Sequence, residues 1–466
     1  MVFSRLFFIY IFLPVCLITY YFARGTKAKN TVLLIFSMLF YAWGEPVYIL
    51  LLILSAGVNY SAGLLIGRFG SSREGKLSAA AAVSFDILML VIFKYSGFIV
   101  ENFNHLLNIS LPVPDIKLPI GISFYTFQTI SYILDCLWET VRPQKSFRKF
   151  LLYISLFPQL IAGPIVRYST IEDEIENRKA DLPDIASGFN RMILGLAKKV
   201  IIADQLSIVA ERLLGDISHA SLSAAWIGAT VYAMQVYFDF SGYSDIAIGL
   251  GRIFGFHFDE NFKHPFMCKD ITEFWQRWHI SLGTFFKDYL LYIPIFGKRR
   301  KYASLMLVWL CTGIWHGAGW NFVIWGLYFG IFIMIETLIG KKRMKRIPLI
   351  IRHIYNKIVI IIGFGIFYFE DLDELGSFFK ALVPFTSSGA ISLSDRITLV
   401  NNMYLVIFAV ILCFPLLSGI KYISEKLTVS STVSSAAATF ISAVLLLLTS
   451  AMLVEQTTHP FLYFRF

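Results

Sequence analysis

Two of the eight histidines lie where an imidazole could take part in chemistry. His316 lies in "CTGIWHGAGWNFVIWG" (311–326), a stretch without a charged residue, and segments typical of membrane helices flank it. Ionisable side chains within membrane spans are costly, so they are functional candidates by default. A neutral imidazole near its pKa can accept a proton, as a general base must. We therefore take His316 as a candidate catalytic residue.

A structural role for His316 stays open beside the catalytic one. A buried imidazole between helices can simply donate a hydrogen bond to a backbone carbonyl. Gly317 and Gly319 favour catalysis, because paired glycines allow a helix to end and a backbone or substrate to approach closely. Trp315 and Trp320 on either side could line a substrate path and exclude water.

His279 is the second candidate, in "EFWQRWHISLGTFFKDY" (273–289). Trp275 and Trp278 beside it also fit an aromatic belt at the membrane interface, with Arg277 reaching toward lipid headgroups. Alternatively, a re-entrant helix directs His279 into the same cavity as His316. Sequence spacing does not show that the two imidazoles meet.

Two carboxylates follow a long apolar run. Asp239 and Asp245 lie in "YFDFSGYSD" (237–245), after the apolar residues 222–238. They could orient an imidazole, accept a hydrogen bond from Tyr243, or hold helices together. Buried charges more often act as paired supports, so the structural role is favoured.

Other catalytic and metal motifs are not indicated. The five cysteines are scattered, without a C-x-x-C pair, and no H-x-x-H, H-x-x-x-H or H-E-x-x-H pattern occurs. "GLGRIFG" (249–255) only approximates a dinucleotide loop, because Phe254 replaces the third glycine; packing between helices explains it better. We expect no metal and no tightly bound cofactor.

Composition places these motifs in a membrane protein. The 466 residues are 57% hydrophobic and 15% charged, against about 25% charged in soluble domains. The mean hydropathy is +0.66, and several apolar runs approach the roughly 20 residues that span a bilayer. The net charge of +10 comes from short basic clusters between these runs. Such clusters mark cytoplasmic loops rather than a nucleic-acid partner.

Basic loops also predict an orientation. The apolar run 6–22 is followed by basic residues, which indicates a retained first helix rather than a cleaved signal peptide. With basic loops inside, both termini lie outside, and 255–296 contains re-entrant or broken helices. The expected crossings are 6–22, two within 31–67, 77–100, 118–137, two within 303–340, 355–369, 402–420 and 436–454.

We therefore expect an all-α polytopic protein with a single membrane domain over 1–466. With the region 150–296 included, it has ten to twelve transmembrane helices plus re-entrant pieces. His316 follows the basic cluster 297–301 by about 15 residues, roughly 20 Å along a helix. This places His316 past the bilayer midplane, toward the outer half.

Four segments carry a resemblance that extends over nearly the whole chain. They are "FPQLIAGPIVRY" (157–168), "YFDFSGYSDIAIGLGRIFGFHFDENFKHPF" (237–266), "ITEFWQRWHISLGTFFKDYLL" (271–291) and "TGIWHGAGWNFVIWG" (312–326). Together they closely resemble the membrane-bound O-acyltransferase family, and within it the membrane subunits of bacterial alginate O-acetyltransferases.

The resemblance implies a ring of helices around a thinned centre, where a cytoplasmic donor entrance meets an external funnel. His316 matches the family's catalytic histidine, and His279 matches its second signature position. The implied reaction moves an acetyl group from acetyl-CoA to a hydroxyl of a polysaccharide at the outer face of the cell membrane, through an extracytoplasmic partner protein. The candidates for the substrate path are Trp275, Arg277, Trp278, Asp239, Asp245, Trp315, Trp320 and Asn321.

The roles of the candidate residues, the acyl donor and the class of function remain open at this point. His316 would act as general base, while His279 would orient a substrate or polarise the oxyanion. Arg277, Lys287 and the basic residues 298–301 could bind CoA phosphates. A carrier-protein thioester, as in teichoic-acid D-alanylation, is an alternative donor. The alternative from a different functional class is a transporter or export channel that uses the histidines as proton relays.

Overall fold

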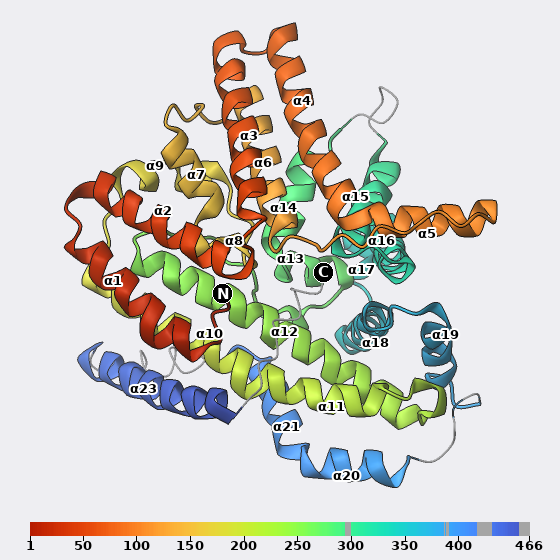
Figure 1. Ribbon diagram of the computed structural model, residues 1–466. Coiled ribbons are helices and arrows are strands. Elements are labelled where there is room, and N and C mark those ends of the chain that lie inside the picture. Colours follow the sequence, from red (N-terminus) through yellow and green to blue (C-terminus); the bar gives the residue numbers. More distant parts are fainter. Residues whose placement is uncertain (294–299, 386, 388–390, 417–430, 456–466) are drawn as a thin grey trace. The chain divides into compact units, whose positions relative to one another are not determined.

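The computed structural model of the protein consists of helices joined by loops (Figure 1). It describes residues 1–293, 300–385, 387, 391–416 and 431–455, and these contain no β-strand. The expected all-α architecture is confirmed for this part of the chain. The C-terminal residues that we expect outside the membrane lie beyond the described residues.

Five helices of the described residues are long and apolar enough to cross a membrane, or six if one bent pair counts as a span. The expected count of ten to twelve is not confirmed. The expected first crossing forms an apolar helix over Phe8–Phe22, which is shorter than these spans. The candidate spans are Ile49–Phe69, Arg73–Leu107, Trp320–Ile339, Leu349–Tyr368 and Val433–Val454, and the bent pair is Leu393–Asn401 with Met403–Leu412.

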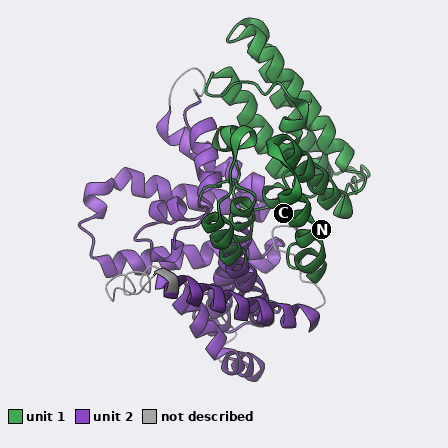
Figure 2. Cartoon of the chain, turned by 90° about the vertical axis from the view of Figure 1, so that its left-hand side faces the viewer, with its two compact units in different colours: residues 1–192, 245–259 green, residues 193–244, 260–466 purple. Residues whose placement is uncertain are grey.

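The chain divides into two compact units (Figure 2). Unit 1 comprises Met1–Met192 and Asp245–Asp259, and unit 2 comprises Ile193–Ser244 and Glu260–Phe466. The expectation of one membrane domain stays a prediction. Both histidine motifs belong to unit 2.

Unit 1 contains the hairpin expected within 31–67, since two helices there are separated by a break at 45–48. Its helices are η1 (Phe8–Phe12), α1 (Leu13–Phe22), α2 (Gly25–Gly44), α3 (Ile49–Phe69), α4 (Arg73–Leu90), η2 (Val91–Tyr95), α5 (Ser96–Leu107), α6 (Ile122–Leu137), α7 (Phe147–Ser155), α8 (Phe157–Leu160) and α9 (Tyr168–Asn177). Two longer helices, α10 (Leu182–Ala197) and α12 (Leu222–Ile253), contribute residues to both units.

Unit 2 holds the expected hairpin within 303–340 as α15 and α16. The described part of the region 255–296, up to residue 293, is broken into short helices, as the polar and aromatic sequence predicts. Besides its share of α10 and α12, the unit contains η3 (Lys198–Ala203), α11 (Asp204–Leu214), η4 (Ile217–His219), η5 (Pro265–Met267), α13 (Ile271–Arg277), α14 (Ile280–Tyr289), α15 (Lys301–His316), α16 (Trp320–Ile339), α17 (Lys341–Met344), α18 (Leu349–Tyr368), α19 (Leu372–Ala381), α20 (Leu393–Asn401), α21 (Met403–Leu412) and α23 (Ser431–Glu455).

Small residues bring α15 and α16 close together. A Cβ added at Gly313 would lie 2.3 Å from the carbonyl oxygen of Phe322, and one at Gly326 would lie 2.4 Å from that of Trp309. Glycines at such crossings allow helix backbones to approach within a membrane. The glycine positions thus fix the crossing of the hairpin that presents His316.

Candidate active site

His279 occupies the corner between two short helices. It precedes the first residue of α14 and adopts a left-handed backbone conformation (φ 45°, ψ 54°). Such a conformation is unusual for a residue other than glycine and often marks a functional site. The residue is only 2% exposed. The corner turns the chain sharply after α13 and buries the imidazole in unit 2.

A polar network determines which ring nitrogen of His279 carries the proton. Its Nδ1 lies 3.2 Å from Oδ1 of Asn261. The backbone N–H of Ser281 and its hydroxyl both donate to the same oxygen, while Nδ2 of Asn261 donates to the hydroxyl of Ser244. Because the contacted atom is an acceptor, Nδ1 of His279 must be the donor.

The neutral ring therefore presents a lone pair at Nε2. Burial lowers the pKa of His279 to about 3, because an apolar environment penalises the charged form. His279 lies outside the candidate spans and stays neutral near pH 7. A neutral ring with this tautomer accepts a hydrogen bond at Nε2 and does not donate one there.

Three aromatic rings surround His316. It is the last residue of α15 and is 5% exposed. Its ring centroid lies 5.0 Å from that of Trp315, 4.8 Å from Trp325 and 5.3 Å from Phe367. The interplanar angles of 71°, 78° and 85° correspond to edge-to-face contacts. The imidazole is thus fixed in an apolar cage.

Trp315 brings the two histidines into one site. Its indole centroid lies 5.9 Å from the ring of His279 and 5.0 Å from that of His316. The two imidazoles are therefore no further apart than the sum of these distances. The structure supplies the proximity that sequence spacing does not show.

Buried polar atoms lie near His316 on α16. Asn321 is 0% exposed, and among the described residues neither its Oδ1 nor its Nδ2 has a hydrogen-bond partner. The same holds for the indole nitrogen of Trp325, whose ring packs against His316. Buried donors without a protein partner call for an explanation, such as a ligand or water. Both are candidates for contacting a substrate.

Two other predicted tryptophans belong to the wall behind the site. The ring of Trp275 contacts Trp309, Trp325 and Phe329, with centroids 4.9, 5.3 and 4.9 Å apart. Trp278 is buried and stacks on Phe274. They pack in the core of unit 2 rather than forming an exposed belt.

Trp320 and Arg277 were also predicted as site residues. Trp320 is 49% exposed at the start of α16. The guanidinium of Arg277 pairs with Glu273, one turn earlier on α13, at 2.5 Å. Contact between Arg277 and CoA phosphates stays a prediction, and residues 298 and 299 lie outside the described residues.

The two aspartates are paired supports in the interior of α12. Asp239 binds Lys199 at 2.7 Å, and the same ammonium binds Asp204 at 2.8 Å, with all three side chains nearly fully buried. Asp245, in unit 1, accepts a hydrogen bond from Arg191 at 2.9 Å. These pairs agree with the structural role favoured from the sequence. Phe240, next to Asp239, packs edge-to-face on His279 at 4.6 Å, so the pair on Lys199 lies behind the site.

Asn261 and Ser281 were not among the predicted site residues. Asn261 lies 18 residues before His279 in "DENFKHPF" (259–266). No motif in this polar loop indicates that Asn261 contacts a histidine. Only the turn at His279 brings the amide to the imidazole. Asn261 is fully buried, which fits a residue that positions the ring.

Comparison with known proteins identifies the family. The family model described as MBOAT, membrane-bound O-acyltransferase family, matches residues 110–370. The probable alginate O-acetylase AlgI of Pseudomonas aeruginosa is 39% identical over 394 residues, covering 83% of this chain and 75% of its own. The peptidoglycan O-acetyltransferase of Helicobacter pylori is 34% identical over 381 residues (74% and 72%).

A more distant relative has a different printed activity. The teichoic acid D-alanyltransferase of Bacillus subtilis is 29% identical over 246 residues, which cover 49% of this chain and 62% of its own. The family match covers more than half of the chain, and its span contains both buried histidines. The chain therefore belongs to the membrane-bound O-acyltransferase family and is an integral membrane enzyme that transfers acyl groups to hydroxyls.

Proposed function

We propose that this protein transfers acetyl groups from acetyl-CoA to hydroxyls of an alginate-like polysaccharide outside the cell. The observation that carries the proposal is the 39% identity to an alginate O-acetylase over 83% of the chain. A second relative of high coverage is also an O-acetyltransferase of a cell-surface polymer. The D-alanyltransferase matches less of the chain with lower identity, which favours acetyl as the transferred group.

His316 is the proposed general base. Its ring takes the proton of the acceptor hydroxyl as the hydroxyl oxygen attacks the thioester carbonyl. The carbon–sulfur bond then breaks, and the proton passes to the departing CoA thiolate. Proton transfer of this kind is worth roughly 10²–10⁴-fold. The aromatic cage of Trp315, Trp325 and Phe367 supports the role by excluding water that would hydrolyse the thioester.

His279 is the proposed positioning group for the acceptor. With Nδ1 donating to Asn261, its Nε2 accepts a hydrogen bond from a substrate hydroxyl. Of its two expected roles, the geometry therefore favours orientation over oxyanion stabilisation. The buried side chains of Asn321 and Trp325 are the better candidates for donating to the developing oxyanion, a role worth about 3 kcal/mol per donor.

The donor and the partner protein belong to the same proposal. The thioester would enter from the cytoplasmic face, and the acetyl group would leave at the outer face, either directly to sugar or through an extracytoplasmic partner. If the donor were a carrier-protein thioester, the enzyme would need a surface that binds the carrier protein in place of a site for the CoA phosphates.

The test uses proteoliposomes that contain the purified protein. Radiolabelled acetyl-CoA is supplied on one face and alginate oligosaccharides on the other, with and without the candidate partner protein. We expect CoA release coupled to acetylation, and a 10²–10⁴-fold loss in the His316→Ala variant. His219→Ala is the matched control, because that side chain is 82% exposed and pairs with Asp216 on the surface.

Each alternative has its own signature in this assay. Transfer from a carrier-protein thioester, with no use of acetyl-CoA, would replace the proposed donor. Undiminished transfer in a folded His316→Ala variant would remove His316 from the chemistry. Absence of transfer from both donors, with the partner supplied, would contradict the proposed acceptor.

A further inference from the structure

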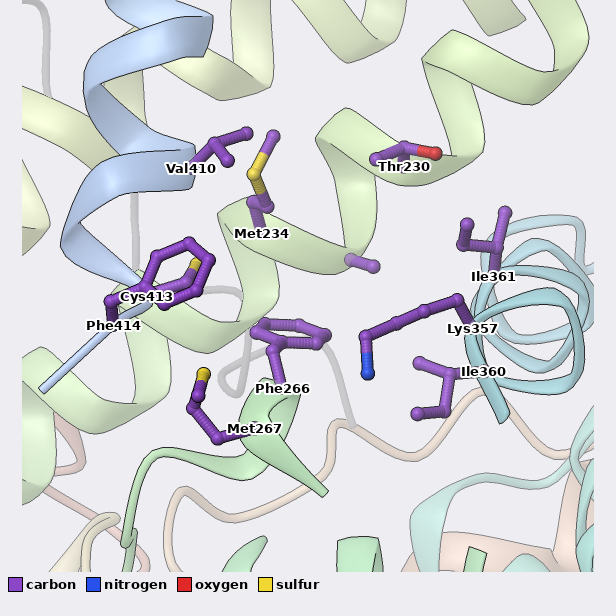
Figure 3. Close-up of a pocket in the computed structure, with 11 residues that line it drawn as sticks. Thr230, Met234, Phe266, Met267, Lys357, Ile360, Ile361, Val410, Cys413 and Phe414 are labelled. Atoms are coloured by element: carbon purple, nitrogen blue, oxygen red, sulfur yellow. The ribbon is translucent and has the colours of Figure 1, made fainter. Parts of the chain in front are cut away.

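A small cavity in unit 2 combines apolar walls with one lysine (Figure 3). Its volume is about 170 Å³. Four elements form the wall, namely α12, η5, α18 and the end of α21. The lining residues include Met234, Phe266, Ile360, Ile361 and Val410, with the side chain of Lys357 along one side (Figure 3).

Lys357 occupies the middle of a candidate membrane span. Eight residues of α18 precede it and eleven follow, and the helix is apolar enough to cross a bilayer. Ionisable residues at such positions are rare because a charge at membrane depth is costly, and they face partners or cavities. The lysine therefore needs a partner or a function.

The described residues do not supply a carboxylate for this ammonium. The two acidic residues of the neighbouring α13 region are engaged elsewhere, since Asp270 binds Arg352 at 2.8 Å and Glu273 binds Arg277. Within the described residues, no carboxylate oxygen lies within 4 Å of the Lys357 nitrogen. The charge of Arg352 on α18 is thus balanced by a carboxylate, and that of Lys357 is not.

The hydrogen-bonding capacity of Lys357 is only partly used. Its Nζ donates to Oδ1 of Asn356 at 2.8 Å and, more weakly, to the sulfur of Cys268 at 4.0 Å. Asn356 is itself fixed, because its Nδ2 donates to the carbonyl of Cys268 at 2.7 Å. An ammonium has three N–H donors, so one remains for a strong acceptor.

The chemistry of the cavity selects an amphiphile. A small inorganic anion would gain from the ammonium but not from the apolar walls, and a neutral alkane would gain only from the walls. An engineered apolar cavity of about 150 Å³ takes a molecule the size of benzene. The cavity therefore fits a short section of an alkyl chain beside an anionic head.

We propose that this cavity binds an anionic single-chain amphiphile, with its carboxylate or phosphate on Lys357 and its alkyl chain against Met234, Phe266 and Ile361. The occupant comes from the bilayer, as a fatty acid or as one chain of an anionic phospholipid. This site goes beyond acyl transfer, because neither His279 nor His316 lines the cavity.

One aromatic contact connects the cavity with the wall of the active site. Phe266 lines the cavity and packs against Trp278, with ring centroids 6.4 Å apart. Trp278 directly precedes His279. An occupant that presses on Phe266 therefore acts on the wall behind the catalytic corner.

The test is photo-crosslinking in phosphatidylcholine nanodiscs with a diazirine analogue of dodecanoic acid, at a pH where the acid is ionised. We expect label on the cavity residues, which peptide mapping by mass spectrometry detects. Excess dodecanoate suppresses the label, and dodecan-1-ol does not. Suppression by phosphatidylglycerol in the nanodisc would assign the site to phospholipid; its absence would assign it to free fatty acid.

Two variants separate the contribution of the ammonium charge from that of the contacts with the alkyl chain. Lys357→Met keeps the length of the side chain and should lower labelling about tenfold, since a hydrogen bond to a charged group is lost. Val410→Trp fills the cavity from its half-exposed side and should lower labelling with Lys357 intact. Lys76→Met, at an exposed lysine outside the cavity, should leave the labelling unchanged.

The wild-type protein alone can overturn the proposal. Equal suppression by the acid and the alcohol would show that the charge plays no part, whether or not Lys357→Met folds. Label that maps outside the cavity, or that is unchanged in a folded Lys357→Met variant, would also contradict it.

Discussion

The two histidines are buried to a similar degree but are held in different ways. His279 lies at a left-handed corner and donates from Nδ1 to an amide oxygen. His316 lies at a helix end among three aromatic rings. Hydrogen bonds select a tautomer, whereas edge-to-face aromatic contacts fix a position without selecting one.

The roles that we propose for the two rings follow from this difference. A histidine whose proton is fixed at Nδ1 is suited to orienting a substrate hydroxyl, because its Nε2 accepts a hydrogen bond and does not donate one. A general base must change its protonation state during each turnover, and this is the role that we propose for His316.

The strongest test compares the two rings directly. His316→Ala should lower kcat by roughly 10²–10⁴-fold, since the proton acceptor is lost. His279→Ala should lower it about ten- to hundredfold, because only orientation is lost. Steady-state transfer assays check the order. Equal losses in two folded variants would refute the division of roles.

The support behind His279 should depend on the buried lysine of unit 2. Lys199→Met leaves Asp204 and Asp239 buried without their cation, and breaking a buried pair in this way costs about 3–5 kcal/mol. We expect a large fall in the unfolding temperature in detergent, measured by intrinsic fluorescence.

Lys149→Met is the matched control, because Lys149 pairs with Glu176 near the surface. An exposed pair contributes about 0–1 kcal/mol. If both variants unfold at the same temperature, the three buried charges are not a support.

The aromatic cage should be sensitive to a single added methyl group. A Cβ at Gly317 would lie 2.1 Å from the ring of Phe322, so Gly317→Ala must displace that ring, which packs on Phe367 of the cage with centroids 5.1 Å apart. Overpacking of this kind costs about 1–3 kcal/mol, and kcat should fall with it. Gly376→Ala on α19 meets no atom within 4 Å and should leave stability and activity intact. Unchanged kcat in Gly317→Ala would show that the cage tolerates rearrangement.

The smallest effect should appear as a change in pH dependence. Asn261→Asp places a carboxylate beside Nδ1 of His279, which favours the imidazolium and raises a pKa that burial holds at about 3. Neutral His279 is the active form, so activity should be lost as the pH falls through the raised pKa. The acidic limb of the kcat profile moves toward neutral pH.

Asn401→Asp, at an exposed asparagine, should leave the profile in place. A profile that is the same for wild type and Asn261→Asp would mean that His279 does not contact the reacting groups.

Local sequence accounted for much of the fold. The apolar runs predicted helices, and the hairpins within 31–67 and 303–340 were both expected. The polar and aromatic region 255–296 was correctly expected to be broken, because it lacks a continuous apolar face. The apolar run 222–238 did not predict the end of its helix, since α12 continues through Asp239 and Asp245 to Ile253.

The sequence by itself determined that this is a helical membrane protein and predicted His279 and His316 as its candidate catalytic residues, because hydropathy and local motifs are properties of neighbouring residues. The tertiary structure decided what each of them contacts. Asn261 reaches His279 across 18 residues, and Lys199 reaches Asp239 across 40, while Trp315 joins the two imidazoles. Such pairs leave no periodic trace in the sequence, since they depend on how helices cross and where a chain turns.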